Sequence, residues 1–236
     1  MEKGKAMELS TLGLKDRAQW EAKGYQLPQF DRAAVTEATR ENPCWIHFGA
    51  GNIFRAFQAN VMQNILNRGE METGLIVAEG FDYEIIEKMN RPHDDYSILV
   101  TLKADGSVEK TVVGSVVESC ILDSENEGEY GRLKEIFCKQ SLQMVSFTIT
   151  EKGYSLANGK GELLPAVAAD FAAGPEKPQA ISEKLHLFYT HVLKTDSFRS
   201  PWYPWITAPI TGINYMRQSI HLPKNGQKTV LQRKIL

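Results

Sequence analysis

The sequence predicts an α/β fold built on a mainly parallel sheet. Short apolar runs bounded by proline, glycine or a charged residue alternate along the chain with segments whose apolar residues recur at helical spacing. Such runs are typical of strands that are buried on both faces of a parallel sheet. Alternating strands and helices place helices against that sheet, and 236 residues can bury one sizeable core.

The composition is that of an ordinary globular protein, with 27 basic residues, 29 acidic residues and 42% hydrophobic residues. No apolar run approaches the ~20 residues of a membrane span, and Met1–Leu14 has no signal-peptide core. We therefore expect a cytoplasmic protein. The three cysteines, Cys44, Cys120 and Cys138, each have apolar neighbours, so we expect buried thiols rather than a disulfide or zinc site.

The elements are expected in a simple order. Residues 1–42 form an N-terminal helical cap, and residues 43–196 form the main domain. The cap holds helices Lys15–Ala22 and Asp31–Glu41 around an extended segment, Tyr25–Pro28. In the main domain, the expected strands are Cys44–Phe48, Gly74–Glu79 and Leu142–Ile149, and the expected helices are Ile53–Arg68, Asp82–Asn90, Glu129–Lys139, Leu163–Ala173 and Ile181–Lys194. Tyr96–Leu102 and Val108–Glu118 predict an inserted β-hairpin.

A glycine turn, Gly49-Ala50-Gly51, joins the first main-domain strand to its helix. Glycines in that position let backbone N–H groups approach a pyrophosphate at the helix N-terminus. The match to the dinucleotide-binding fingerprint is partial, because Phe54 stands where a third glycine belongs. Glu79 closes the second strand 28 residues after Gly51, where it could accept a ribose hydroxyl, and its charge favours NAD over NADP. The alternative is a glycine turn in an unrelated α/β fold with an exposed Glu79.

Other polar residues allow either a functional or a structural interpretation. Arg55 could pair with a phosphate or lie on a solvated helix face. We interpret His47 as a hydrogen-bonded core histidine rather than a ligand, and Asp94 and Asp95 as turn residues rather than a catalytic pair. Thr148–Tyr154 leaves the carboxyl end of a buried strand, where doubly wound folds bind ligands, although a surface turn remains possible.

Two segments resemble a known family. His47–Ala59 is similar to the cofactor-binding segment of the mannitol dehydrogenase family of polyol-specific long-chain dehydrogenases, H-x-G-x-G-x-F-x-R-A-H-Q-A, and Thr148–Tyr154 is similar to its T-x-T-E-x-G-Y. The departures are Ile53, where the family usually has Phe, and Phe54 and Phe57, where many members have His. They leave the phosphate turn intact and leave the subfamily open.

The resemblance implies a Rossmann-like doubly wound domain that binds NAD for metal-free hydride transfer. It implies that Gly49, Gly51 and Arg55 contact the diphosphate, that Glu79 contacts the adenosine ribose, and that Glu151 lies near the nicotinamide and the reacting carbinol. The cofactor-binding residues expected in this way are Gly49, Ala50, Gly51, Asn52, Ile53, Arg55, Glu79 and Thr150. The general base of the family is a lysine in a C-terminal helical domain, and we expect this chain to lack that domain.

The segments Arg91–Asp95 and Val112–Val116 resemble most the hexuronate branch of the family, the D-mannonate oxidoreductases or fructuronate reductases. The implied reaction interconverts D-fructuronate and D-mannonate. Mannitol or other polyol dehydrogenases and tagaturonate reductases of the same family are the alternatives. A different class of alternative is a non-catalytic nucleotide-binding fragment.

Residues 197–236 differ from the rest, with six basic residues and no acidic residue. The resemblance ends near residue 196. Codons for Trp202 onward can be chosen so that the frame displaced by one base reads M-V-S-M-D-N-C-S-H-N-G, which contains the family's S-x-D-N-x-x-x-N-G. We therefore expect the last ~35 residues to be an out-of-frame, poorly ordered tail. A basic arm that binds nucleic acid is the weaker interpretation, because the six charges are scattered.

The expected partner of the protein is a small hexuronate or polyol, with no nucleic acid and no membrane, and the oligomeric state stays open.

Overall fold

The structure is a computed structural model that describes residues 7–148, 157–173 and 178. Its strands are β1 (Tyr25–Gln26), β2 (Trp45–Phe48), β3 (Leu75–Glu79), β4 (Ser97–Leu102), β5 (Val108–Val113), β6 (Val116–Ile121) and β7 (Met144–Phe147). Its α-helices are α1 (Arg17–Glu21), α2 (Arg32–Glu41), α3 (Asn52–Ala56), α4 (Gln58–Asn67), α5 (Glu127–Cys138) and α6 (Pro165–Ala173). Three short turns of other helix types are η1 (Gly13–Lys15), η2 (Ile85–Asn90) and η3 (Arg91–His93).

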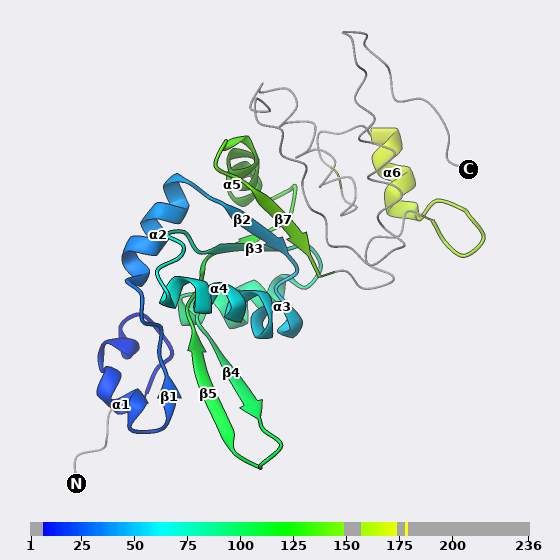
Figure 1. Ribbon diagram of the computed structural model, residues 1–236. Helices are drawn as coiled ribbons and strands as arrows, with labels where there is room; N and C mark the ends of the chain where they lie inside the picture. The colour runs from blue at the N-terminus through cyan, green and yellow to red at the C-terminus, as the bar shows by residue number, and fades with distance from the viewer. Residues whose placement is uncertain (1–6, 149–156, 174–177, 179–236) are drawn as a thin grey trace.

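A four-stranded sheet in the order β6-β3-β2-β7 forms the centre of the molecule, and each adjacent pair of strands is parallel (Figure 1). The chain adds strands outward on one side of β2 and then crosses to its other side to form β7. This order is that of a doubly wound Rossmann-like fold, whose ligand crevice lies where the direction of winding reverses. The predicted fold class is therefore confirmed.

Helices cover both faces of this sheet (Figure 1). On one face, α4 contributes Ala59, Met62 and Leu66 to a core shared with Leu75 and Val77 of β3. On the other face, α5 packs against β2 and β3 through a second core, which includes Tyr130, Leu133, Ile136, Ile46 and Ile76. Because successive residues of a strand face opposite sides, each inner strand needs an unbroken apolar run, and this is why Cys44–Phe48 and Gly74–Glu79 could be recognised in the sequence.

A second, three-stranded sheet has the order β1-β5-β4, in which β4 and β5 form the predicted hairpin (Figure 1). The boundary of its second strand was wrong: Val108–Glu118 is two strands, because β5 ends at Val113 and β6 begins at Val116 in the other sheet. Gly114 lies at the break, where an added Cβ would come within 2.7 Å of the Tyr96 ring. Only a residue without a side chain lets the backbone pass that ring.

Two predicted helices also need correction. Ile53–Arg68 is divided into α3 and α4, because Phe57 has φ −104° and ψ −74°. Phe57 is 67% exposed, so no core contact of its side chain opposes the break. Asp82–Asn90 was predicted as an amphipathic helix, whereas most of it is the π-helical turn η2.

Residues 7–42 are joined to the rest of the chain by the β1–β5 pair, by an apolar cluster that includes Trp20, Tyr96 and Val112, and by polar contacts. Asp31 accepts hydrogen bonds from Ala33 N and Ala34 N and so begins α2. The Arg32 guanidinium then donates to the carbonyl oxygens of Gly114 and Val116 and lies 4.1 Å from the centroid of the Tyr96 ring. The cation–π contact and these two carbonyl acceptors hold the arginine across the β5–β6 junction.

Some predictions concern residues outside the described ranges, namely the helix Ile181–Lys194 and the tail 197–236. Among the residues that the structure does describe, none of the helices combines the length and the apolar character that a membrane span requires.

Candidate functional site

The glycine turn follows the carboxyl end of β2 and lies beside the carboxyl end of β7, where the direction of winding reverses and doubly wound folds bind their ligands. Gly49 has φ +106°, a backbone conformation that side chains oppose, and its N–H donates to the Ala78 carbonyl oxygen at 2.8 Å. A Cβ at Gly49 would also lie 3.3 Å from both the Cβ and the carbonyl oxygen of Thr148, which directly follows β7. The turn therefore requires glycine at position 49 for its backbone and for its closeness to β7.

Gly51 has a different reason to be glycine. Its backbone is extended, with φ −69° and ψ 177°, which any residue can adopt. A Cβ added there would meet no atom of the described chain within 4 Å. The missing side chain thus leaves open space directly before α3, where a pyrophosphate could approach the backbone.

Phe54 explains the incomplete glycine fingerprint. Its side chain is 1% exposed and its ring stacks on His47, with centroids 4.3 Å apart and an interplanar angle of 8°. The position of the third glycine is therefore filled by a core aromatic ring.

Glu79 holds the turn from the adjacent strand, β3. Its Oε2 accepts a hydrogen bond from Ala50 N at 2.8 Å, and its Oε1 accepts from Gly80 N at 2.9 Å and Phe81 N at 3.0 Å. The residue is 6% exposed, so the alternative of an exposed acid is wrong. A carboxylate has about four acceptor positions. Within the described residues Oε2 accepts only from Ala50 N, which leaves it able to accept from a ribose hydroxyl.

The beginning of α3 contains three more of the expected cofactor residues. Arg55 donates to Asn52 Oδ1 at 2.7 Å, and partial burial lowers the pKa of its guanidinium from the ordinary value. Ile53 is 61% exposed beside them. The structure thus gathers Gly49, Gly51 and the α3 residues at one crevice, whereas Thr150 and Glu151 lie outside the described ranges.

A buried polar seam that sequence reasoning had not identified lies beneath the turn. His47 Nδ1 is 2.7 Å from Ser146 Oγ, and its Nε2 is 2.8 Å from Thr148 Oγ1. Trp45 Nε1 donates to the same Ser146 Oγ at 2.7 Å. A sequence signal existed, because Trp45 and His47 alternate along one strand and Ser146 and Thr148 along another, which puts all four on one face once the strands pair. Interpreting His47 as a hydrogen-bonded core residue is confirmed.

Burial of His47 predicts a specific dependence of stability on pH. Desolvation lowers the pKa of His47 from 6.5 to about 4, so the unfolded chain binds a proton at a higher pH than the folded chain does. Keeping His47 neutral therefore contributes about 3 kcal/mol to the free energy of unfolding. This stabilisation is complete above pH 6.5 and is lost as the pH falls toward 4.

The measurement is urea unfolding at about pH 7 and about pH 4 for wild type and His47→Gln. Glutamine cannot take up the proton. Between about pH 7 and about pH 4, the free energy of unfolding of the variant should therefore fall by about 3 kcal/mol less than that of wild type. Equal pH dependence in the two proteins would contradict a neutral buried His47.

Asp94 and Asp95 occupy a turn, as predicted. Both have left-handed backbone conformations, with φ 49° and 63°, and Asp94 Oδ2 accepts from Thr11 N at 2.8 Å. Asp95 Oδ1 accepts from the Asn90 amide. The Asp94 carboxylate is therefore held by the N-terminal segment, and the Asp95 carboxylate by its own turn.

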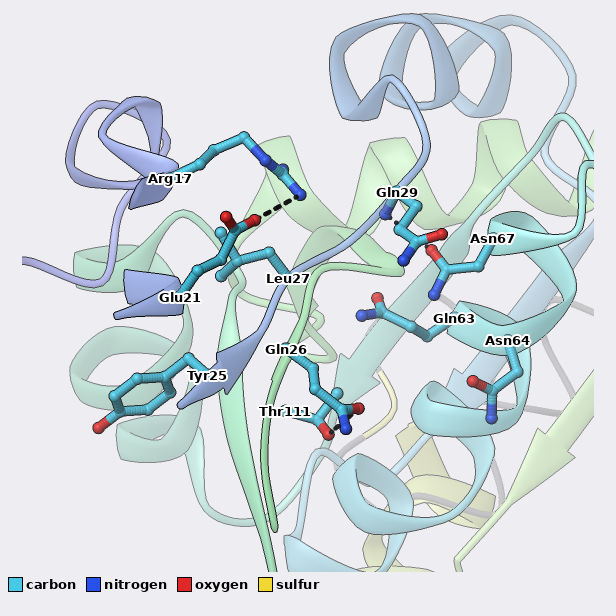
Figure 2. Close-up of a pocket in the computed structure, with 10 residues that line it drawn as sticks. All are labelled: Arg17, Glu21, Tyr25, Gln26, Leu27, Gln29, Gln63, Asn64, Asn67 and Thr111. Carbon is cyan, nitrogen blue, oxygen red and sulfur yellow. Dashed lines mark hydrogen bonds and ion pairs between the residues drawn. The ribbon is translucent and has the colours of Figure 1, made fainter. Parts of the chain in front are cut away.

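A cavity of about 220 Å³ lies between α1, β1, α4 and β5, away from the glycine turn (Figure 2). Its lining is mostly polar, and several of its amides already serve the fold. Gln63 donates to the Val112 carbonyl oxygen and accepts from Gly114 N, and Asn67 Oδ1 accepts from Gln29 N. The two Gln63 bonds join α4 to the end of β5, and the Asn67 bond joins α4 to the segment before α2. Since these amides serve the fold, the glycine turn is the better candidate site.

Comparison with known proteins finds oxidoreductases that are similar to this chain. Over 179 residues, 76% of its length, the chain is 46% identical to a D-mannonate oxidoreductase of Thermotoga maritima. Over 156 residues, 64% of its length, it is 30% identical to a mannitol 2-dehydrogenase of Cereibacter sphaeroides. The chain spans about a third of the length of these relatives, 33% and 30% respectively. No protein-family model matches it.

Among solved structures, the fold is similar to that of Pseudomonas fluorescens mannitol 2-dehydrogenase in a ternary complex with NAD and D-mannitol. The TM-score is 0.64 at 22% identity, and the match covers 80% of this chain and 36% of that one. At this identity the likeness supports the Rossmann-like fold alone.

Proposed function

We propose that this chain, a homologue of members of the mannitol dehydrogenase family, binds NAD at the crevice formed by the glycine turn. The observation that carries the proposal is the buried Glu79 carboxylate, which holds Ala50 N while keeping an acceptor position on Oε2. Gly51 supplies the open space that a diphosphate needs beside it. Arg55, in the last turn of the five-residue helix α3, would contribute a positive charge toward the phosphates.

The same carboxylate favours NAD over NADP. A 2′-phosphate would bring negative charge against a buried acid that already accepts three close backbone hydrogen bonds. A ribose hydroxyl can instead donate to Oε2. Like charges at close range cost several kcal/mol in a partly dry site, so discrimination between the two cofactors should be large.

When bound, the nicotinamide supplies the hydride chemistry of an oxidoreductase. The described residues of this chain would bind and orient the cofactor. Thr150 and Glu151 are proposed to lie near its reactive end. The proposed organisation of the chain is an N-terminal cap (1–42), an NAD-binding domain (43–196) and a tail (197–236).

The proposed reaction is the interconversion of a hexuronate ketone and its alcohol, D-fructuronate and D-mannonate. It is supported by the identity of 46% with a D-mannonate oxidoreductase, which is higher than the 30% shared with a mannitol 2-dehydrogenase. Mannitol or another polyol is the second candidate substrate, because both kinds of relative share the same region with this chain.

The test is a titration of the purified 236-residue chain with NADH and NADPH, followed by nucleotide fluorescence and by calorimetry. We expect saturable NADH binding and at least about tenfold weaker NADPH binding, equivalent to about 1.4 kcal/mol or more. Failure to bind NADH would overturn the proposal, and equal affinity for NADPH would remove the role of Glu79 in cofactor choice.

Turnover is measured separately with D-fructuronate, D-mannonate and D-mannitol. Reduction of D-fructuronate in preference to the other compounds supports the hexuronate assignment. NADH binding without turnover of any of them favours the reading of a non-catalytic nucleotide-binding chain.

A further inference from the structure

Donor and acceptor can be assigned for the hydrogen bonds of the polar seam under the glycine turn. It comprises Trp45 and His47 on β2 and Ser146 and Thr148 at β7, linked by three hydrogen bonds of 2.7 to 2.8 Å. The indole N–H of Trp45 can only donate, so Ser146 Oγ must accept at that end. The direction of the remaining bonds depends on which nitrogen of His47 carries the proton.

One tautomer of His47 satisfies the buried groups and the other does not. If Nδ1 carries the proton, Ser146 Oγ accepts twice and its own hydroxyl proton has no acceptor among the described residues, although Ser146 is only 5% exposed. If Nε2 carries the proton, the Ser146 hydroxyl donates to Nδ1 and Nε2–H donates to Thr148 Oγ1. A buried hydroxyl without a partner costs about 1–3 kcal/mol, so the Nε2–H tautomer is favoured.

In that tautomer, the proton without an acceptor in the seam is the one on the Thr148 hydroxyl. Thr148 is half-buried, unlike His47 and Ser146, and it lies where the chain leaves β7. A Cβ at Gly49 would lie only 3.3 Å from the Thr148 Cβ, so Thr148 and the glycine turn are immediate neighbours. Among the described residues this hydroxyl proton has no acceptor, and the donor lies beside the glycine turn, directly after β7.

Protonation of His47 at Nδ1 would reverse the hydrogen bond between His47 and Ser146. Both ring nitrogens would then donate, and Ser146 would lose its acceptor. Within the described part of the chain, the hydrogen-bond and stacking partners of the ring are Ser146, Thr148 and Phe54, and none of them is charged. Desolvation accordingly keeps the imidazole neutral, with its pKa lowered to about 4.

We propose that His47 is a positioning residue, which through its neutral Nε2–H tautomer holds the Thr148 hydroxyl as a hydrogen-bond donor toward an oxygen of the bound NAD. This inference rests on the proposed NAD site and assigns to it a donor from β7 in addition to the turn and Glu79. It also gives the buried histidine a role that an apolar core residue of the same shape could not fill.

The first test needs no substitution at Thr148. Long-range ¹H–¹⁵N correlation NMR of the imidazoles reports which nitrogen carries the proton in the 236-residue chain at about pH 7. The chain has five histidines, so the signals of His47 are assigned by their loss in His47→Gln. The Nε2–H pattern is expected, and an Nδ1–H or doubly protonated pattern would overturn the proposal.

The second test compares Thr148→Val with Thr148→Ser by NADH titration and by thermal unfolding. Valine keeps the shape and removes the hydroxyl, so the NADH dissociation constant should rise about five- to tenfold, the range expected for one lost hydrogen bond. Serine keeps the hydroxyl and should bind NADH within about twofold of wild type.

The outcomes separate this proposal from the proposed function. If wild type binds NADH and Thr148→Val binds it equally well, or if Thr148→Ser is as weak as valine, the role of Thr148 is refuted and the NAD site stands. If wild type does not bind NADH, both the NAD site and the role of Thr148 are refuted, whichever tautomer the NMR shows.

Discussion

Gly51→Val should weaken NADH binding about a hundredfold or more while lowering the melting temperature by less than about 4 °C. The extended backbone of Gly51 accepts a side chain, and a Cβ there meets no atom of the described chain within 4 Å. The only expected cost to folding is a poorer N-cap for α3. The valine methyls would instead occupy the space proposed for the diphosphate, so the loss should be confined to binding.

Gly49→Ala is the matched comparison within the same turn. Its φ of +106° and the 3.3 Å approach to the Thr148 carbonyl oxygen predict a loss of about 2–3 kcal/mol in the free energy of unfolding. Urea unfolding and NADH titration of both variants separate the two roles. A Gly51→Val protein that binds NADH normally would contradict the placement of the cofactor at this turn.

Glu79→Ala should be the most destabilising of these substitutions, by about 4 kcal/mol. Its carboxylate accepts at 3.0 Å or less from Ala50 N, Gly80 N and Phe81 N, and the residue is buried. Removal leaves three backbone donors near one another with no acceptor, and the turn that they hold loses its anchor to β3. NADH binding should be lost with it, as measured by urea unfolding and NADH titration.

Glu79→Gln is the control for charge. Its amide oxygen can still accept from part of this set, so the loss of stability should be about half that of alanine. Since its side chain is neutral, any preference for NADH over NADPH should shrink. A glutamine variant as stable as wild type, with an unchanged cofactor preference, would show that the charge of Glu79 has no part in the site.

Local patterns were sufficient for the elements that build the crevice. β2 and β3 were recognisable because an inner parallel strand must be apolar on both faces. The turn between β2 and α3 was recognisable because two glycines separated by one residue join a strand to a helix there. Glu79 could be identified as the acid that closes β3.

Long-range packing decided where the predictions failed. Val108–Glu118 reads as a single strand, and only the close passage of Gly114 against Tyr96 divides it between two sheets. Phe54 reads as a departure from a glycine fingerprint, whereas its ring is the stacking partner of His47. The π-helical turn η2 has the same apolar spacing as an α-helix, so periodicity could not distinguish the two.

The sequence by itself determined the fold class, the position of the glycine turn and the acid that follows it, because each depends on residues that are neighbours in the chain or one strand apart. Only the tertiary structure decided what those residues contact. Glu79 reaches Ala50 N across β2 and β3, and His47 reaches Ser146 and Thr148 across β2 and β7. The physical reason is that strand pairing sets which side chains share a face, and partners about 100 positions apart in the chain leave no periodic signal in either segment alone.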